Sequence, residues 1–197
     1  MPQAIEPPTR TLPLGEPSRF RWSVPQYENL FSMGLLPNGS YELLNGDVVE
    51  KMPTRYPHAH VVTLFFALFS RFYGFPFLLT QSSLYIDDEN LPEPDFTVLK
   101  SLHPTLTDEG HVGAEDVQTV IEVSDTTLNT DLTTRAILYA RAGIPEYWVV
   151  DVSGRRLLIH DTPATDGYAS VTEYTETESA VVNSVQNAAF SVADILP

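Results

Sequence analysis

Apolar residues recur at helical intervals in three segments of the chain. Residues 23–36 begin with a serine, and a proline follows just inside the first turn, which is a common helix start. Residues 58–72 place apolar side chains three and four positions apart along one wide face. Residues 130–143 begin with Thr130, an N-cap candidate, and end with Gly143, a typical helix stop. The pattern therefore predicts three helices.

Pairs of shorter apolar runs predict two hairpins. In residues 41–52 the runs flank Asn45 and Gly46, the strongest short signal for a two-residue hairpin turn. Residues 146–161 hold a second pair around a Ser-Gly dipeptide, and we expect Asp151 to stabilise that turn.

Other apolar runs predict single strands. Residues 77–86 and 96–100 are two of them. Residues 117–123 are β-branched and apolar apart from Gln118, Thr119 and Glu122, which suits a central strand covered on both faces. Residues 162–197 predict one or two edge strands and a loose C-terminus. The order of elements predicts a mixed α/β (α+β) fold with one sheet and a few helices packed on it.

Composition narrows the class of protein. An apolar fraction of 43% is enough for one core, so we expect a single domain over residues 19–197 and an extended arm over residues 1–18, which are rich in proline. The sequence lacks cysteine and has neither a signal-peptide pattern nor an apolar run long enough for a membrane span. These features favour a cytoplasmic protein without a membrane partner.

The net charge of −15 argues against tight, sequence-independent DNA binding by an isolated monomer, because 11 Lys and Arg face 26 Asp and Glu. A global charge does not exclude a local basic groove.

Two carboxylates stand out as candidates for chemistry. Glu122 lies in an otherwise apolar strand, where a charge is costly unless it is paired or binds a cation. Asp95 lies at the start of a short strand. Carboxylates on adjacent strands can hold a metal ion that activates water. The alternatives are an arginine partner for Glu122 and a simple Pro-Asp turn at Asp95.

Weaker candidates surround this pair. Glu42 shares a strand face with Leu44 and either points inward or is solvated beside the turn. Gln81 interrupts an apolar run. Its side-chain amide forms hydrogen bonds either with a metal-bound water or a phosphate, or with a neighbouring protein group. His58 and His60 are either metal ligands or capping or surface residues at the start of a helix.

In this order, the elements resemble the Uma family of putative restriction endonucleases. The resemblance runs from about Phe20 to about Tyr168, and its most specific stretches are EPDFTVL, VIEVSDTTLNTD and LYARAGIPEYWVVD. It implies a PD-(D/E)XK, restriction-endonuclease-like core with a central mixed β-sheet flanked by helices. The implied activity is cleavage of DNA phosphodiester bonds with Mg²⁺ or Mn²⁺.

The resemblance also implies roles for individual residues. Asp95 and Glu122 match the metal-binding acids, and the main-chain carbonyl of Val123 would complete the metal shell. Three further residues match family positions near the site: Glu42, His58 and Gln81.

The chain departs from the family pattern at the lysine. The usual nuclease lysine position holds Ser124, and the family's alternative position, four residues after Asp131, holds Arg135. An arginine stays protonated and cannot readily act as a base, but it can hold a phosphate. Alternatively, Arg135 forms a structural salt bridge with Asp131 or Glu122.

Three functions follow as hypotheses. The first is a Mg²⁺-dependent endonuclease acting on DNA, with a homodimer as its expected assembly. The second is a catalytically silent nucleic-acid-binding or assembly module of the same fold. The third is a metal hydrolase of another phosphoester.

Overall fold

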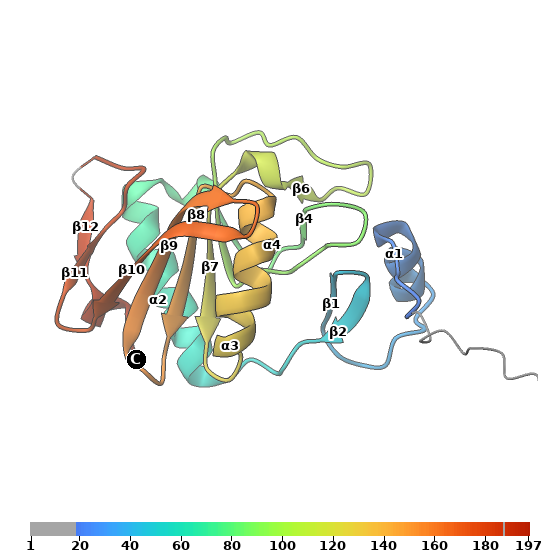
Figure 1. The fold of residues 1–197 in the computed structure, drawn as a ribbon, viewed down its shortest axis with the longest axis horizontal. Coiled ribbons are helices and arrows are strands. Elements are labelled where there is room, and N and C mark those ends of the chain that lie inside the picture. The colour runs from blue at the N-terminus through green and yellow to red at the C-terminus, as the bar shows by residue number, and fades with distance from the viewer. Residues whose placement is uncertain (1–18, 187) are drawn as a thin grey trace, which may run out of the picture.

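The computed structural model of the protein describes residues 19–186 and 188–197, so the predicted N-terminal arm lies outside the described residues. A six-stranded sheet in the order β10-β9-β8-β7-β5-β3 forms its centre (Figure 1). The β7–β8 pair is parallel and the other neighbours are antiparallel. In chain order the strands are β3 (Leu78–Thr80), β5 (Phe96–Leu99), β7 (Val117–Ser124), β8 (Glu146–Asp151), β9 (Arg156–Ala164) and β10 (Gly167–Thr175).

Helices cover both faces of this sheet. Helix α2 (Tyr56–Phe72) lies behind it in Figure 1, and the segment ending in α4 (Ala136–Arg141) lies in front. That second segment starts with α3 (Leu128–Thr130) and continues through η3 (Asp131–Arg135), a π-helical turn. The mixed α/β class with a central mixed sheet is thereby confirmed.

Side-chain alternation along β7 assigns each residue to one face. Ile121 and Val123 pack in the core beneath α2, where Phe65 and Phe69 are fully buried. Val120 packs on the opposite side, in the core that includes residues of α4. Because successive strand residues alternate, Glu122 shares the face of Val120 and points toward η3 and α4.

The N-terminal part forms a smaller unit beside the sheet. Helix α1 (Val24–Ser32) has the predicted start at Ser23, whose backbone N–H donates to Oε1 of Gln26 at 3.0 Å, as in a capping box. Strands β1 (Tyr41–Leu44) and β2 (Asp47–Glu50) form the predicted hairpin. A small core joins the helix to the hairpin, with these buried members: Val24, Tyr27, Leu43 and Leu91.

Short elements complete the described chain. Two small sheets pair β4 (Leu84–Tyr85) with β6 (Val112–Gly113) and β11 (Ser179–Val181) with β12 (Ala189–Ser191). The 3-10 turns are η1 (Phe75–Phe77), η2 (Ala114–Asp116) and η4 (Val192–Ile195). None of the helices within the described ranges is both long and apolar enough to cross a bilayer.

Predictions for three segments were wrong. The strand expected over residues 77–86 is broken at Gln81, whose φ of 48° is incompatible with an extended strand, and its two halves join different sheets. Thr130 lies inside the helical segment, and Thr127 takes the N-cap position. The C-terminus is held by burial of Ile195 and Leu196, because these apolar side chains complete the core beneath α2.

Candidate functional site

A cavity of about 280 Å³ opens between the β1–β2 hairpin, the segment that follows it, and the C-terminal end of β7. We call it the acid cavity, because four buried carboxylates line it: Glu42, Asp95, Glu122 and Asp131. The cations that also line it are Lys51, Arg55 and Arg135.

Strand pairing brings Asp95 and Glu122 together. Phe96 pairs with Ile121 in the antiparallel β5–β7 ladder, so the residue before Phe96 lies beside the residue after Ile121. The backbone N–H of Asp95 donates to Oε2 of Glu122 over 3.3 Å. The two acids proposed from the sequence are therefore neighbours in space.

The carboxylate of Asp95 is held through one of its oxygens. Oδ2 accepts a hydrogen bond from the backbone N–H of Val123 at 2.8 Å and lies 2.9 Å from Nε2 of His58. Among the described residues, none forms a hydrogen bond with Oδ1. Asp95 is thus oriented by its neighbours and keeps one oxygen available.

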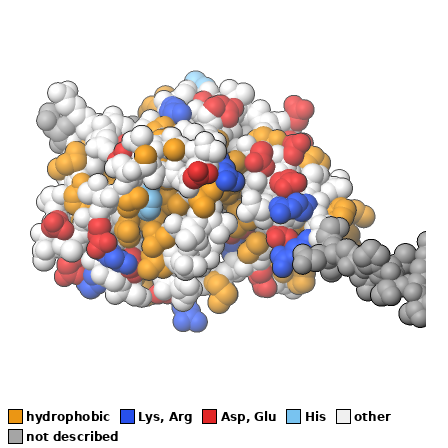
Figure 2. Space-filling view, viewed as in Figure 1, with side chains coloured by type: hydrophobic (Ala, Val, Ile, Leu, Met, Phe, Trp, Pro, Cys, Tyr) orange, Lys and Arg blue, Asp and Glu red, His pale blue; other side chains and the backbone are white. Residues whose placement is uncertain are grey.

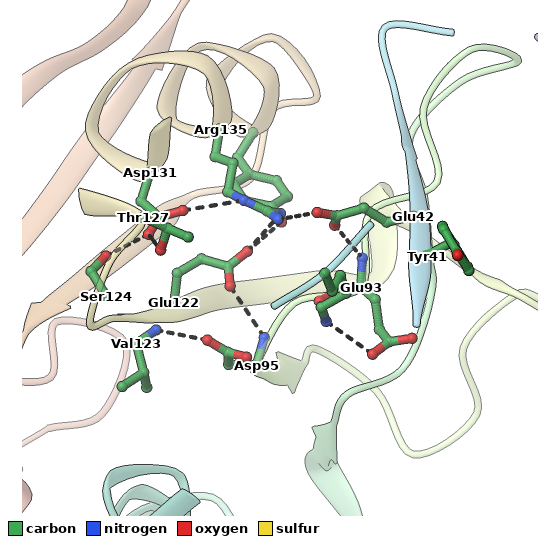
Figure 3. Close-up of polar contacts among 12 residues, drawn as sticks. Tyr41, Glu42, Glu93, Asp95, Glu122, Val123, Ser124, Thr127, Asp131 and Arg135 are labelled. Carbon is green, nitrogen blue, oxygen red and sulfur yellow. Dashed lines mark hydrogen bonds and ion pairs between the residues drawn. The ribbon is translucent and has the colours of Figure 1, made fainter. Parts of the chain in front are cut away.

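Arg135 lies at the centre of the remaining carboxylates (Figure 3). Its Nη1 donates to Oε1 of Glu122 at 3.0 Å, its Nε lies 3.2 Å from Oδ1 of Asp131, and its Nη2 donates to Glu42. The salt-bridge alternative for Arg135 is confirmed, and it involves both Asp131 and Glu122. Sequence reasoning had not paired Arg135 with Glu42, which comes from a hairpin far away in the chain.

The π-helical turn contributes to this arrangement. Asp131 and Arg135 are its first and last residues, and both side chains are buried. Asp131 is held by hydroxyl donors from Ser124 and Thr127, the latter at 2.6 Å. Single π-helical turns occur frequently at functional sites. Here the turn directs a carboxyl group and a guanidinium of the same helical segment into one cavity.

Tyr139 is a site residue that the sequence analysis missed. Its hydroxyl donates to Oε1 of Glu122 at 2.9 Å and is fully buried with it. The signal was present, because Tyr139 follows Arg135 by four positions and so lies on the same helix face.

Burial and charge shift the acids in opposite directions. Burial acts to raise the pKa of Asp95, but hydrogen bonds from His58 and Val123 outweigh it, and the pKa lies below its ordinary value. Burial raises the pKa of Glu122 well above its usual range, although Arg135 opposes the shift. Burial also raises the pKa of Asp131. Of these three acids, Asp95 is therefore the one most firmly held in its charged form.

The carboxylates of the acid cavity provide part of the ligands that a metal ion needs. Within the described ranges, no group of three or more His, Asp or Glu side chains could hold a metal ion by itself. Mg²⁺, however, is usually held by one or two carboxylates together with water and substrate phosphates. Asp95, with a free oxygen, and its neighbour Glu122 fit such an incomplete site.

The other predicted residues lie around this centre. Glu42 is buried, in agreement with the inward orientation considered from the sequence. Its carboxylate also accepts a hydrogen bond from the N–H of Glu93 at 3.3 Å. His58 lines the acid cavity, whereas Gln81 lines a neighbouring one. His60 stacks on Tyr56.

Comparisons with known proteins bear on the family and the fold. The model of the Uma2 family, described as "Putative restriction endonuclease", matches residues 24–193. A similar solved structure is that of a putative nuclease belonging to DUF820 from Anabaena variabilis ATCC 29413. Its TM-score is 0.66 at 12% identity, over 88% of this chain and 96% of that chain. Among curated proteins, none matches this chain.

Proposed function

Because the chain belongs to the Uma2 family of putative restriction endonucleases, we propose that it is an endonuclease that hydrolyses DNA phosphodiester bonds with bound Mg²⁺ or Mn²⁺. The observation that carries the proposal is the adjacency of Asp95 and Glu122 in the acid cavity. The proposal includes a cytoplasmic location, where such an enzyme meets its substrate.

Asp95 and Glu122 would hold the metal ion, with the carbonyl of Val123 as a third ligand. The ion, when bound, would stabilise negative charge on the phosphate and lower the pKa of a water molecule. Four buried carboxyl groups share the acid cavity with the buried guanidinium of Arg135, and a divalent cation bound there would stabilise the charged form of Glu122, whose pKa is raised by burial.

The chain's own residues keep the two ligands in place. Val123 and His58 orient Asp95 through Oδ2, and Tyr139 holds Oε1 of Glu122. Arg135 acts as a positioning residue: its charge offsets the mutual repulsion of Glu42, Glu122 and Asp131. Because its nitrogens already contact three carboxylates, we favour this role over direct binding of the scissile phosphate.

The test is a calorimetric titration with Mn²⁺, followed by a plasmid-cleavage assay in Mg²⁺, Mn²⁺ or EDTA. We expect the wild type to bind Mn²⁺ and Asp95→Asn to weaken binding by at least about 100-fold, the upper end of the loss caused by removing a supporting residue. Glu122→Gln should behave in the same way. Asp125→Asn is the matched control, because Asp125 also lines the acid cavity but is exposed.

Cleavage that requires the metal and is lost in Asp95→Asn, but not in Asp125→Asn, would support the proposal. If neither Mn²⁺ binding nor cleavage occurs, even with an oligonucleotide present, the endonuclease proposal is wrong.

One observation favours a second candidate, the catalytically silent nucleic-acid-binding module. Arg135 already neutralises part of the acid cluster without any metal ion. That candidate predicts DNA binding without cleavage in the same assay. Hydrolysis of small phosphomonoesters instead of DNA would identify a hydrolase of another phosphoester.

We also propose a homodimer, since cutting both strands of a duplex is simplest with two copies of one site. Light scattering of the purified protein checks this, and a monomer with and without DNA would contradict it.

A further inference from the structure

A second cavity, of about 230 Å³, adjoins the acid cavity. Both are lined by Thr54 and His58, so these two side chains form the wall between them. A DNA strand that passes through the acid cavity can therefore extend directly into the second cavity.

The lining of the second cavity suits an uncharged, flat ligand. Its members are Thr54, His58, Ala59, Val62, Thr80 and Gln81. This set contains hydroxyl, amide and imidazole groups beside an apolar wall from α2, but neither lysine nor arginine. A phosphate prefers cationic partners, whereas a nucleobase presents polar edges and apolar faces. The chemistry of the second cavity is therefore that of a base and not of a phosphate.

Gln81 is held in a strained conformation at this cavity. Its φ of 48° lies in the left-handed region, which a residue other than glycine rarely adopts. Strain of this kind persists where the surrounding structure enforces it, and it is concentrated at functional sites. Here the N–H of Gln81 donates to the carbonyl oxygen of Asp95 at 3.3 Å. The strained turn is thus attached directly to the acid of the neighbouring cavity.

Two side chains at the second cavity, Gln81 and His58, have unsatisfied hydrogen-bonding capacity. The amide nitrogen of Gln81 makes only a long contact of 3.5 Å, to Thr54 Oγ1, and the Gln81 side chain is otherwise exposed. Nδ1 of His58 is buried without a hydrogen-bond partner among the described residues, although the other ring nitrogen contacts Asp95. A buried polar atom without a partner is costly, so a change in the orientation of the His58 ring toward a ligand with a polar edge would be favourable.

From these observations we propose that the second cavity binds one unpaired nucleobase of the substrate, next to the phosphodiester held in the acid cavity. The inference rests on the proposed function and names its substrate class: DNA with an unpaired or flipped-out nucleotide beside the cleaved bond. A base that stays stacked in a duplex cannot enter a cavity, so it must first leave the stack.

The first test fills the second cavity without touching the acid cavity. Ala59 is exposed on α2 and lines only the second cavity, so Ala59→Leu occupies its volume and keeps a good helix former. Ala67→Leu is the matched control, because Ala67 is exposed on the same helix and lines neither cavity. Binding of a fluorescent single-stranded oligodeoxynucleotide is measured by anisotropy in EDTA, which prevents cleavage.

We expect Ala59→Leu to weaken single-strand binding by about 10-fold, comparable with the loss of one base-stacking contact, and Ala67→Leu to leave it unchanged. Gln81→Asn tests the amide independently, since asparagine tolerates a positive φ but reaches less far. It should weaken single-strand binding as well. Binding of a fully paired duplex should be the same in all three variants.

A small diester separates this inference from the proposed function. Bis(4-nitrophenyl) phosphate needs only the acid cavity, so Ala59→Leu should hydrolyse it as the wild type does in Mn²⁺. If the diester and DNA are cleaved but Ala59→Leu binds single strands normally, the base-binding inference is wrong and the endonuclease stands. If nothing is cleaved while Ala59→Leu selectively loses single-strand binding, the base site stands and the endonuclease proposal fails.

Discussion

At the scale of single residues, Arg135 determines how three of the four buried acids can share one cavity. A guanidinium offers donors in a planar fork, so one side chain can contact Glu42, Glu122 and Asp131 at once. Burial acts to lower the pKa of Arg135, but its interactions with Glu122, Tyr139 and Glu42 more than compensate, and the pKa is raised. Arg135 therefore stays a cation near neutral pH.

Replacing Arg135 by alanine should strongly destabilise the protein, because it leaves buried carboxylates without their partner. We expect Arg135→Ala to lower the free energy of unfolding by about 3–5 kcal/mol at neutral pH, measured by urea denaturation. Arg141→Ala, at an exposed arginine of α4 that only donates one hydrogen bond to the carbonyl oxygen of Thr165 among the described residues, should change it by no more than about 1.5 kcal/mol. Equal losses in the two variants would contradict a central role for Arg135.

At the scale of elements, the β1–β2 hairpin carries Glu42 to the acid cavity. Its turn residues Asn45 and Gly46 have φ angles of 50° and 72°, as a two-residue turn of this type requires. Gly46 also packs closely, since an added Cβ would lie 2.7 Å from Cβ of Arg21. The position of Glu42 therefore depends on a turn that only glycine fits.

Gly46→Ala should consequently destabilise the protein more than a glycine substitution that adds backbone strain alone. Gly34 is the matched control, because its φ is 65° and an added Cβ would meet nothing within 4 Å. We expect Gly34→Ala to cost about 1–2 kcal/mol. Gly46→Ala should cost at least about 1 kcal/mol more, from overpacking, in the same denaturation experiment. Identical costs would show that the contact with Arg21 is easily relieved.

At the scale of the whole molecule, the charge distribution limits how DNA can approach. Acidic and basic side chains are interspersed on the face shown in Figure 2 and form no extended basic patch there. The lining of the acid cavity nevertheless includes Lys51, Arg55 and Arg135. Lys51 contacts Glu93 at 2.9 Å and Arg135 is enclosed by acids, so Arg55 is the cation best placed to meet a phosphate.

Because few cations can contact phosphates, the affinity for DNA should depend only weakly on salt concentration. Arg55 should make one of these phosphate contacts. We expect Arg55→Gln to reduce the slope of log affinity against log salt concentration by about 1, as the loss of one phosphate contact does. Arg71→Gln, at an exposed arginine in the last turn of the same helix, should leave the slope unchanged. Fluorescence anisotropy over a series of salt concentrations measures both, and equal slopes in the two variants would exclude this contact.

Local patterns in the sequence were sufficient for most elements. The helix at residues 58–72 was predicted within two residues of α2, because its apolar spacing coincides with the face that packs on the sheet. The hairpin at Asn45-Gly46 was predicted because its turn chemistry is local. Asp151 likewise accepts from the N–H of Gly154 at 2.7 Å, as expected for a turn-stabilising acid.

The sequence by itself determined that Glu122 needs a partner, since an acid in an apolar strand cannot be buried alone. Only the tertiary structure decided that the partner is Arg135, that Glu42 shares it, and that Asp95 lies alongside. It also decided that Gln81 breaks a strand and faces a separate cavity. The physical reason is that periodicity and turn chemistry act over a few residues, whereas ion pairs and cavities depend on how strands and helices distant in the chain are packed together.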